Sequence, residues 1–476
     1  MAYRYGDRYQ MNMFPQSIED YVAKDDPVRA YDAFAGTLDL KELGIVIEAD
    51  KEGNPQYDPE AMVKLLLYGC SYGIRSSRKL ERACYHNISF IWMMGGLKPD
   101  HKTISEFRKN NKRALAGIIK QCARLCVKLG LIEGNTLFTD GSKIRANASI
   151  NNSFTKERAE RLLANIDKRI EQILTECDRT DEKERDESSH VKLSEELKDK
   201  QVLKNKIADA LAELKDSHKK SINITDDECV KVKGRQGIHA GYNGQIVVDE
   251  KHGLIANSDV VSESTDINQF SSQIEQAQTV IGHPCKNACA DAGYANTDNL
   301  KRIHDKDITV IVPTKSQAHD TKSGPFDKEQ FRYDDTNDCY ICPEGQKLHY
   351  ESFEASRKHL IYRISDVKIC LACKHHGTCT KSRHGRRIRR LVNDKTKTIL
   401  EQIYRTESSQ QIYKLRKEKV EHPFGHMKRN LGVASFLLRG VEAVKAEMSM
   451  FSSCFNISRL ITICSGVQGF VARLST

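Results

Sequence analysis

Long apolar segments are missing from this chain of 476 residues. No stretch approaches the roughly 18 uninterrupted apolar residues that a membrane-spanning helix needs. The opening residues MAYRYGDRYQMNMF also lack the apolar core of a secretory signal peptide. We therefore expect a soluble, cytoplasmic protein with no membrane partner.

The cysteines lack the pattern of an oxidised framework, although the chain has 15 of them. Most lie singly in apolar segments, as Cys122, Cys126 and Cys454 do. Cysteines scattered in this way through a long intracellular chain are usually reduced core residues. A disulfide-rich secreted protein is thereby disfavoured.

A strong charge imbalance is missing as well, because 75 Lys and Arg residues stand against 65 Asp and Glu residues. The resulting formal charge of +10 and pI near 8.8 favour a polyanionic partner without identifying it. At this length the chain has room for roughly three ordinary domains.

Three acidic residues, far apart in the chain, are candidate metal ligands. Asp140 follows the β-branched and aromatic run 135–139, which predicts a strand that ends at this carboxylate. Asp291 follows a similar run and precedes Gly293, and Glu421 lies in a charged segment of helical character. The alternative interpretation of each acid, taken alone, is a strand cap or a solvated surface charge, as most Asp and Glu residues are. Together they suit two Mg²⁺ or Mn²⁺ ions, which prefer hard oxygen ligands.

The N-terminal region, from about residue 15 to 128, is predicted to be helical. Segments 76–82 and 99–108 each place a polar cap before a basic, amphipathic run. Helices joined in this way form either a helix-turn-helix that enters a DNA groove or an ordinary helical bundle.

Extended and helical segments alternate after residue 220. The runs 244–249 and 254–261 flank a four-residue turn and predict a β-hairpin. Helices at about 268–281 and 296–303 and a strand at 308–312 follow. This order predicts a mixed sheet covered by helices, with Asp140 and Asp291 at strand ends.

The segment from about 154 to 217 interrupts the α/β pattern. Apolar residues alternate there at spacings of three and four, which predicts the seam of an antiparallel helical hairpin. A very polar stretch, 178–190, would form its tip. The seam either pairs the two arms or forms a dimer, and the tethered partner arm favours pairing within the chain. The seam residues are Ala159, Leu163, Ile166, Ile170, Ile173 and Cys177 on the first arm, and Leu203, Ile207, Ala210 and Leu214 on the second.

Two C-x-x-C pairs, Cys339 with Cys342 and Cys370 with Cys373, lie 27 residues apart, and Cys379 is nearby. Such pairs can present four thiolates to one structural Zn²⁺ ion. A reduced, metal-free cluster is the alternative interpretation.

A dense basic run follows at 381–390, and such runs bind phosphate backbones or form solvated loops. Further basic residues surround Glu421 and follow Asp140. The candidate DNA contacts are Lys143, Arg145, Arg386, Arg387, Arg389, Arg390, Lys417 and Lys428.

These motifs resemble those of the DDE transposases of bacterial insertion sequences, and the resemblance covers nearly the whole chain. It rests on PDHKTISEFR, TDGSKIRANAS, GYNGQIVVD, ADAGYAN and the segment around Glu421. In that last segment the family carries tyrosine, arginine, glutamate and lysine along one helix, here Tyr413, Arg416, Glu421 and Lys428. Arg416 lies one residue further from Glu421 than the family pattern has it, so Lys417 is an alternative. Glu418 is the rival third acid.

The resemblance implies an RNase H-like mixed-sheet core with Asp140, Asp291 and Glu421 as its catalytic metal ligands. It also implies DNA as partner, at transposon ends and target, and a homodimer or larger assembly. We expect a helical DNA-binding domain at 1–130, a core divided among 131–152, 221–325 and 393–476, a helical hairpin at 153–220, and a zinc-ribbon-like insertion with the basic segment at 326–392.

The implied function is Mg²⁺-dependent cleavage and transfer of DNA strands at the terminal inverted repeats of an insertion sequence, with the enzyme associated with the bacterial nucleoid. Two alternatives stay open: a hydrolytic nuclease of the same fold, and a non-enzymatic DNA-binding protein derived from a transposase.

Overall fold

The computed structural model describes residues 17–45, 56–181, 187–217, 219–234, 237–319 and 324–474, without the side chains of 177–194. The chain is mixed α/β, which confirms the expected fold class at that level. It divides into two compact units. One contains Met1–Asp266, Gln273–Pro284 and Lys417–Thr476, and the other contains Ile267–Ser272 and Cys285–Arg416.

The first unit begins with the expected helical region. Asp58 and Asp100 cap two of its helices, because their carboxylates accept hydrogen bonds from Glu60 N (3.1 Å) and Thr103 N (2.7 Å). The helices predicted to start near residues 76 and 99 are present and contact each other. The elements are α1 (Pro27–Gly36), α2 (Pro59–Ser71), α3 (Ser77–His86), α4 (Ile88–Met93), α5 (His101–Asn110) and α6 (Lys112–Lys128).

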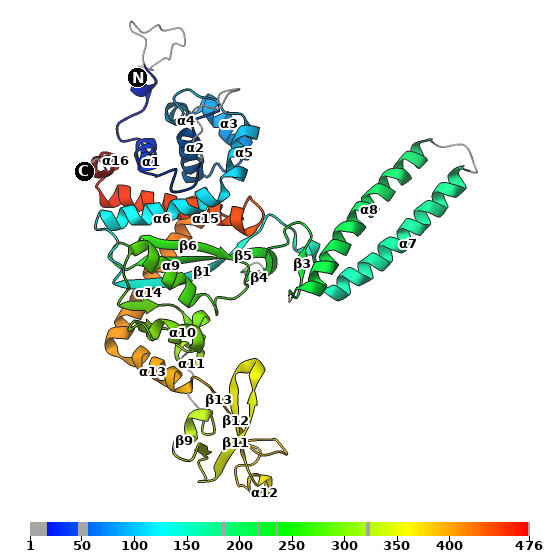
Figure 1. Cartoon of the computed structure of the whole chain (residues 1–476), viewed down its shortest axis with the longest axis vertical. Helices are drawn as coiled ribbons and strands as arrows, with labels where there is room; N and C mark the ends of the chain where they lie inside the picture. The colour runs from blue at the N-terminus through cyan, green and yellow to red at the C-terminus, as the bar shows by residue number, and fades with distance from the viewer. Residues whose placement is uncertain are drawn as a thin grey trace, which may run out of the picture. The chain divides into compact units, whose positions relative to one another are not determined.

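The sheet of the first unit is antiparallel and centred on β5 (Gly237–Asp249), which pairs with β1 (Thr136–Arg145), β4 (Val230–Gly234) and β6 (Ile255–Val261). The expected β-hairpin is confirmed as β5–β6, with Gln245 opposite Asp259. Helices α6 and α15 (Val441–Ile463) pack on each other and on β6 (Figure 1). They bury the apolar side chains of this layer.

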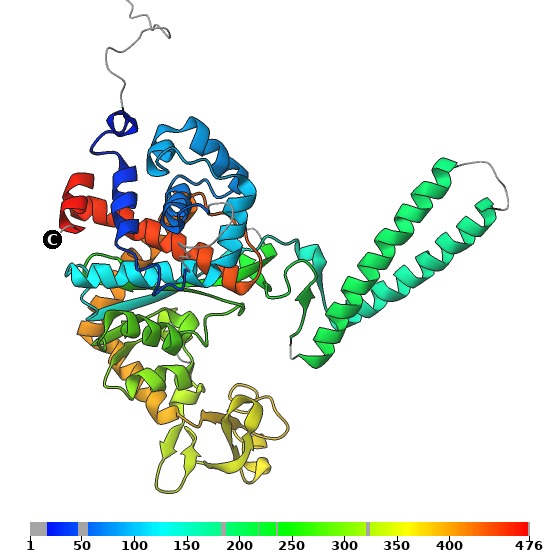
Figure 2. The same ribbon diagram turned by 45° about the horizontal axis from the view of Figure 1, so that its top comes forward.

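A helical hairpin leaves this unit between β2 (Ser153–Phe154) and β3 (Ile222–Asn223), which pair at its base. Its arms, α7 (Lys156–Asp181) and α8 (Glu187–Asp216), run side by side in Figures 1 and 2. The seam is closed within the chain: Ala159, Ile166, Ile173, Ile207, Ala210 and Leu214 are all buried. The side chains of Cys177 and of the polar tip 178–190 lie outside the described residues.

The second unit contains a parallel strand pair, β7 (Asn287–Cys289) and β8 (Thr309–Ile311), connected through α10 (Thr297–His304). Helix α13 (Asp394–Arg405) packs on both β8 and α10. This confirms the expected alternation of strand and helix after residue 285. Helix α14 (Glu407–Arg429) belongs to this unit up to Arg416 and to the first unit from Lys417 onwards.

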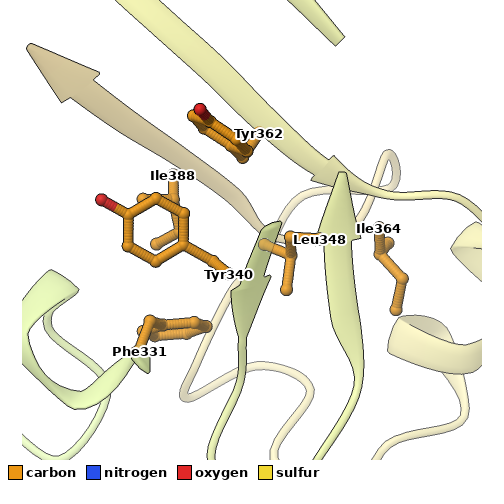
Figure 3. Packing of buried hydrophobic residues seen from close by; sticks show 6 residues of the cluster. All are labelled: Phe331, Tyr340, Leu348, Tyr362, Ile364 and Ile388. Atoms are coloured by element: carbon orange, nitrogen blue, oxygen red, sulfur yellow. The ribbon is translucent and has the colours of Figure 1, made fainter. Parts of the chain in front are cut away.

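A separate antiparallel sheet in the second unit has the order β13-β12-β11-β10-β9. Its strands are β9 (Arg332–Asp334), β10 (Cys339–Ile341), β11 (Lys347–Glu354), β12 (His359–Ile364) and β13 (Arg387–Leu391). One face is apolar, and Figure 3 shows its small core of Phe331, Tyr340, Leu348, Tyr362, Ile364 and Ile388.

Among the described residues, no single helix is long and apolar enough to cross a membrane. Helices α15 and α16 (Val467–Leu474) meet that criterion only when joined across a bend of 102°.

Candidate functional site

Asp140 lies in the middle of β1, which corrects the expectation that it ends a strand. The strand continues to Arg145 because β5 supplies a partner for every residue, from Leu137 opposite Asp249 to Arg145 opposite Gly241. Gly141 and Ser142 have little strand propensity of their own, so tertiary pairing extends the strand beyond what the sequence predicts.

The end of α14 lies over the face of β1 that carries Asp140. Successive strand side chains point to opposite faces, so Asp140 and Ser142 share a face. Lys428 Nζ, on α14, donates a hydrogen bond of 2.7 Å to Ser142 Oγ. An ammonium group is therefore fixed two residues along the strand from Asp140.

The orientation of α14 distinguishes Glu421 from Glu418. Each residue of an α-helix is rotated by roughly 100° about the helix axis relative to the one before it. Measured from the buried Val420, Glu421 therefore lies roughly 100° around the axis and Glu418 roughly 160° around it. Lys417 and Lys428 lie on the Glu421 side, at roughly 60° and 80°. On an ideal helix Glu421 therefore lies about 20° from Lys428 and Glu418 about 80° from it. Both glutamates are exposed, so the choice of Glu421 as third acid stays a prediction.

Lys143 lies on the opposite face of β1, which corrects its assignment as a phosphate contact beside Asp140. Its Nζ forms an ion pair with Asp266 Oδ1 at 2.9 Å. Asp266 Oδ1 also accepts hydrogen bonds from Asn243 Nδ2 (2.8 Å) and Gln245 Nε2 (2.7 Å). A side-chain carbon on Gly141 would come within 2.4 Å of this cluster, so only glycine fits there.

Asp266 was missed by sequence reasoning because it stands alone in a polar segment, SESTD, with no motif around it. Arg145 shares the face of Lys143 and is exposed. Its backbone oxygen accepts a hydrogen bond of 2.8 Å from Phe436 N, which ties the segment after α14 to β1.

In the second unit, Asp291 lies two residues after the end of β7 and caps a 3₁₀ turn, η3 (Ala292–Tyr294). Its carboxylate accepts a hydrogen bond of 2.8 Å from Gly293 N. The expected position after a strand end, at a glycine turn, is confirmed.

Arg416 and Tyr413 of α14 are neighbours of Asp291. Burial raises the pKa of the nearby Cys289 thiol to about 12, and the Asp291 charge adds to this while Arg416 opposes it. Burial likewise raises the pKa of Tyr413; the positive charge of Arg416 opposes this shift and the negative charge of Asp291 adds to it. The Arg416 guanidinium lies 5.6 Å from the Tyr413 ring centre. Arg416 and Asp291 therefore both lie near Cys289 and Tyr413, and Lys417 is exposed.

The three predicted acids are divided between the units: Asp140 and Glu421 belong to the first, and Asp291 to the second. Within the part of the chain that the structure describes, no three His, Cys, Asp or Glu side chains form a group arranged to hold a metal ion. The carboxylates themselves are of the type that Mg²⁺ and Mn²⁺ prefer.

The basic segment is partly a strand, β13, and its arginines differ in role. Arg386 donates hydrogen bonds to the backbone oxygens of Cys379 (2.8 Å) and Phe326 (2.6 Å). Arg390 stacks 3.6 Å from the Tyr333 ring centre and is only 12% exposed. Arg387 and Arg389 are exposed. Arg386 and Arg390 thus make contacts within the protein, whereas Arg387 and Arg389 are exposed; DNA contact by these four arginines stays a prediction.

The face of this sheet that carries Arg387 is basic. Cross-strand register places His349, Arg363 and Arg387 side by side. Lys347 lies two residues before His349 on β11. It pairs with Ile341 of β10, whose other neighbour is Arg332 of β9. Glu351 and Glu354 partly neutralise this face by pairing with Arg363 and Arg389. We call Arg332, Lys347, His349, Arg363, Arg387 and Arg389 the basic face.

The cysteines of the second unit that lie together in the structure are not the four that form the two C-x-x-C pairs in the sequence. Cys342, Cys370, Cys373 and Cys379 line one cavity of about 280 Å³. Cys339 does not line it, because it alternates with Tyr340 along β10 and points to the other face of the sheet. The structure thus replaces Cys339 by Cys379 as the fourth thiol.

Two family models match the chain. A transposase domain family (DUF772) matches residues 16–110, and a transposase DDE domain family matches residues 341–461. These two matches support a DDE transposase of the insertion-sequence type. In this transposase the first match takes in α1–α5, and the second takes in Glu421 and Lys428, while Asp140 and Asp291 precede it. No curated protein and no solved structure matches the chain significantly.

Proposed function

We propose that this transposase binds the terminal inverted repeats of an insertion sequence and catalyses strand cleavage followed by strand transfer, using Mg²⁺ or Mn²⁺. Asp140, Asp291 and Glu421 would hold the metal ions. When bound, such ions lower the pKa of a water molecule and stabilise a departing 3′ oxygen. The same acids would serve both steps, because transfer exchanges one phosphodiester for another.

The contact between α14 and β1 is the observation that carries this proposal. Lys428 is held at Ser142, on the strand face of Asp140, and Glu421 shares its helix stripe. A cation at that position stabilises the charge that develops on a reacting phosphate. Arg416 and Asp291 both lie near Cys289. Lys428 and Arg416 are thus the bases that we propose hold the DNA backbone.

DNA binding would involve two further surfaces. The outward side of α3 exposes Arg78, Lys79 and Arg82. The basic face of the second unit offers guanidinium groups that can bind phosphates in bidentate fashion. Joining two transposon ends to one target requires at least two active sites, so we expect a dimer or larger assembly on DNA.

A cleavage and joining assay tests the proposal. Purified protein is incubated with labelled terminal-repeat DNA and unlabelled target DNA, with Mg²⁺ or with chelator. We expect nicked ends and target-joined products with Mg²⁺ only. Cleavage without joined product would instead indicate the hydrolytic nuclease. Binding without cleavage would indicate a non-enzymatic DNA-binding protein.

A further inference from the structure

The thiol cavity of the second unit lies outside the proposed DNA chemistry. Its four cysteines come from separate places: Cys342 follows β10, Cys370 lies on α12 (Val367–Leu371), and Cys373 and Cys379 lie in the segment that leads to β13. Apolar side chains of the small core, including Leu348 and Ile364, form its wall. The cavity therefore gathers soft ligands from three segments at one edge of that core.

Backbone turns hold two of the sulfur atoms in a thiolate-stabilising environment. Gln346 N lies 3.3 Å from Cys342 Sγ, and His375 N lies 3.5 Å from Cys373 Sγ. The turn after Cys342 closes through Gly345, whose positive φ of 79° is accessible to glycine. N–H groups directed at sulfur are the outer-shell contacts that orient and stabilise cysteine ligands of metals.

The fourth thiol, Cys379, lines the same cavity as Cys342, Cys370 and Cys373. Several thiolates in one apolar cavity repel each other unless a cation is present. Among the described residues the sulfurs are not arranged as a metal-binding group, so zinc binding requires these side chains to approach one another.

We propose that Cys342, Cys370, Cys373 and Cys379 bind one structural Zn²⁺ ion. On binding, each thiol releases its proton to solvent and forms one Zn–S bond. Four sulfur ligands close a tetrahedral shell, which leaves no position for a substrate. The ion would attach the segment 365–386 to the sheet.

The size of the core explains why such an ion would be useful. Its fully buried cluster has only the six residues drawn in Figure 3. Small cores often need a metal or a disulfide to be stable. The described cysteines of this chain are free thiols, which leaves a metal as the available cross-link.

Metal analysis of the full-length protein tests the proposal. The comparison uses Cys379→Ser against Cys339→Ser, a matched control that removes a cysteine from the same sheet but not from the cavity. We expect about one zinc per chain in the wild type and in Cys339→Ser, and less than about one fifth of that in Cys379→Ser. A third variant, Cys379→His, keeps a zinc-binding side chain and should retain the metal.

Replacement of zinc by Co²⁺ gives a second measurement, because four thiolates produce strong sulfur-to-cobalt absorption. The wild type and Cys339→Ser should show this absorption, and Cys379→Ser should show it weakened. Wild-type protein with no zinc, or equal zinc in Cys379→Ser and Cys339→Ser, would overturn the proposal. So would an iron–sulfur absorption spectrum. None of these readouts depends on DNA cleavage, so this proposal can fail while the transposase function stands.

Discussion

Side-chain direction separates neighbouring residues that look equivalent in the sequence. Asp140 and Lys143 are three residues apart in one motif, yet they lie on opposite faces of β1. Glu418 and Glu421 are also three apart, and only Glu421 shares the stripe of Lys428 on α14. At this scale the structure reduces the candidate active-site residues to those that can act together.

The choice of third acid gives a direct prediction at this scale. Glu421→Gln keeps size and helix propensity but removes a charged metal ligand. We expect cleavage of terminal-repeat DNA to fall at least about 100-fold, since even outer-shell changes at metal sites cost about 10–100-fold. Glu418→Gln, the matched control, should cleave within about twofold of wild type because its side chain points away from the buried side of α14. Equal losses in both variants would contradict the assignment.

At the scale of elements, the position of the segment between α14 and α15 depends on residues other than the three predicted catalytic acids. The segment between α14 and α15 is fixed by Glu447, whose Oε2 accepts hydrogen bonds from Leu437 N (2.8 Å) and Leu438 N (2.9 Å). Arg75 contacts Glu447 at 3.6 Å and donates a hydrogen bond of 2.7 Å to Ser435 O. Arg108, in the motif PDHKTISEFR, is buried and bonds to Arg75 O. Arg108 therefore supports Arg75, which in turn contacts the segment between α14 and α15.

Removing the Glu447 carboxylate should destabilise the first unit. Glu447→Ala leaves the N–H groups of Leu437 and Leu438 without their acceptor and removes the ion pair with Arg75. Because the carboxylate is buried, we expect a loss of roughly 3–5 kcal/mol in the free energy of unfolding. Glu447→Gln should lose less, because its side-chain oxygen still accepts the hydrogen bonds. Urea unfolding of both variants measures this, and equal losses would contradict the hydrogen-bonding role.

The same residue makes stability depend on pH. Burial raises the pKa of Glu447 above its ordinary value, although the bonds from Leu438 and Leu437 and the charge of Arg75 oppose this. Between the unfolded and folded pKa values the folded state binds more protons, so stability falls as pH rises through that window. Wild type should show this fall relative to Glu447→Gln in urea unfolding above pH 4.5, the ordinary value. A rise would contradict it.

The arginines of the segment 386–390 give separate predictions for DNA binding and for stability. The double variant Arg387→Ala with Arg389→Ala should weaken binding of any DNA sequence and lower the salt slope of log affinity by about 2, because each arginine is expected to neutralise one phosphate. Its thermal stability should stay near wild type. Arg386→Ala, by contrast, should lose about 1–3 kcal/mol of stability, because it removes part-buried hydrogen bonds to Cys379 O and Phe326 O. Titrations at several salt concentrations, with thermal melts, measure both.

At the scale of the whole molecule, local patterns were predictable and long-range grouping was not. The β5–β6 hairpin, the seam of α7 with α8 and the turn at Asp291 follow from short periodicities and glycine positions. The full length of β1, the cluster around Asp266 and the cavity with Cys379 depend on partners distant in sequence. Spacing alone paired Cys339 with Cys342, because it cannot show that strand alternation turns Cys339 to the other face.

The central claim is that Asp140 and Asp291 are both needed for the metal-dependent reaction. The most direct measurement is single-turnover cleavage of terminal-repeat DNA by Asp140→Asn and Asp291→Asn, with DNA binding measured in the same samples. The account predicts that both variants bind the repeat like wild type but lose cleavage and joining in Mg²⁺, each by at least about 100-fold. Cleavage at the wild-type rate by either variant would contradict it.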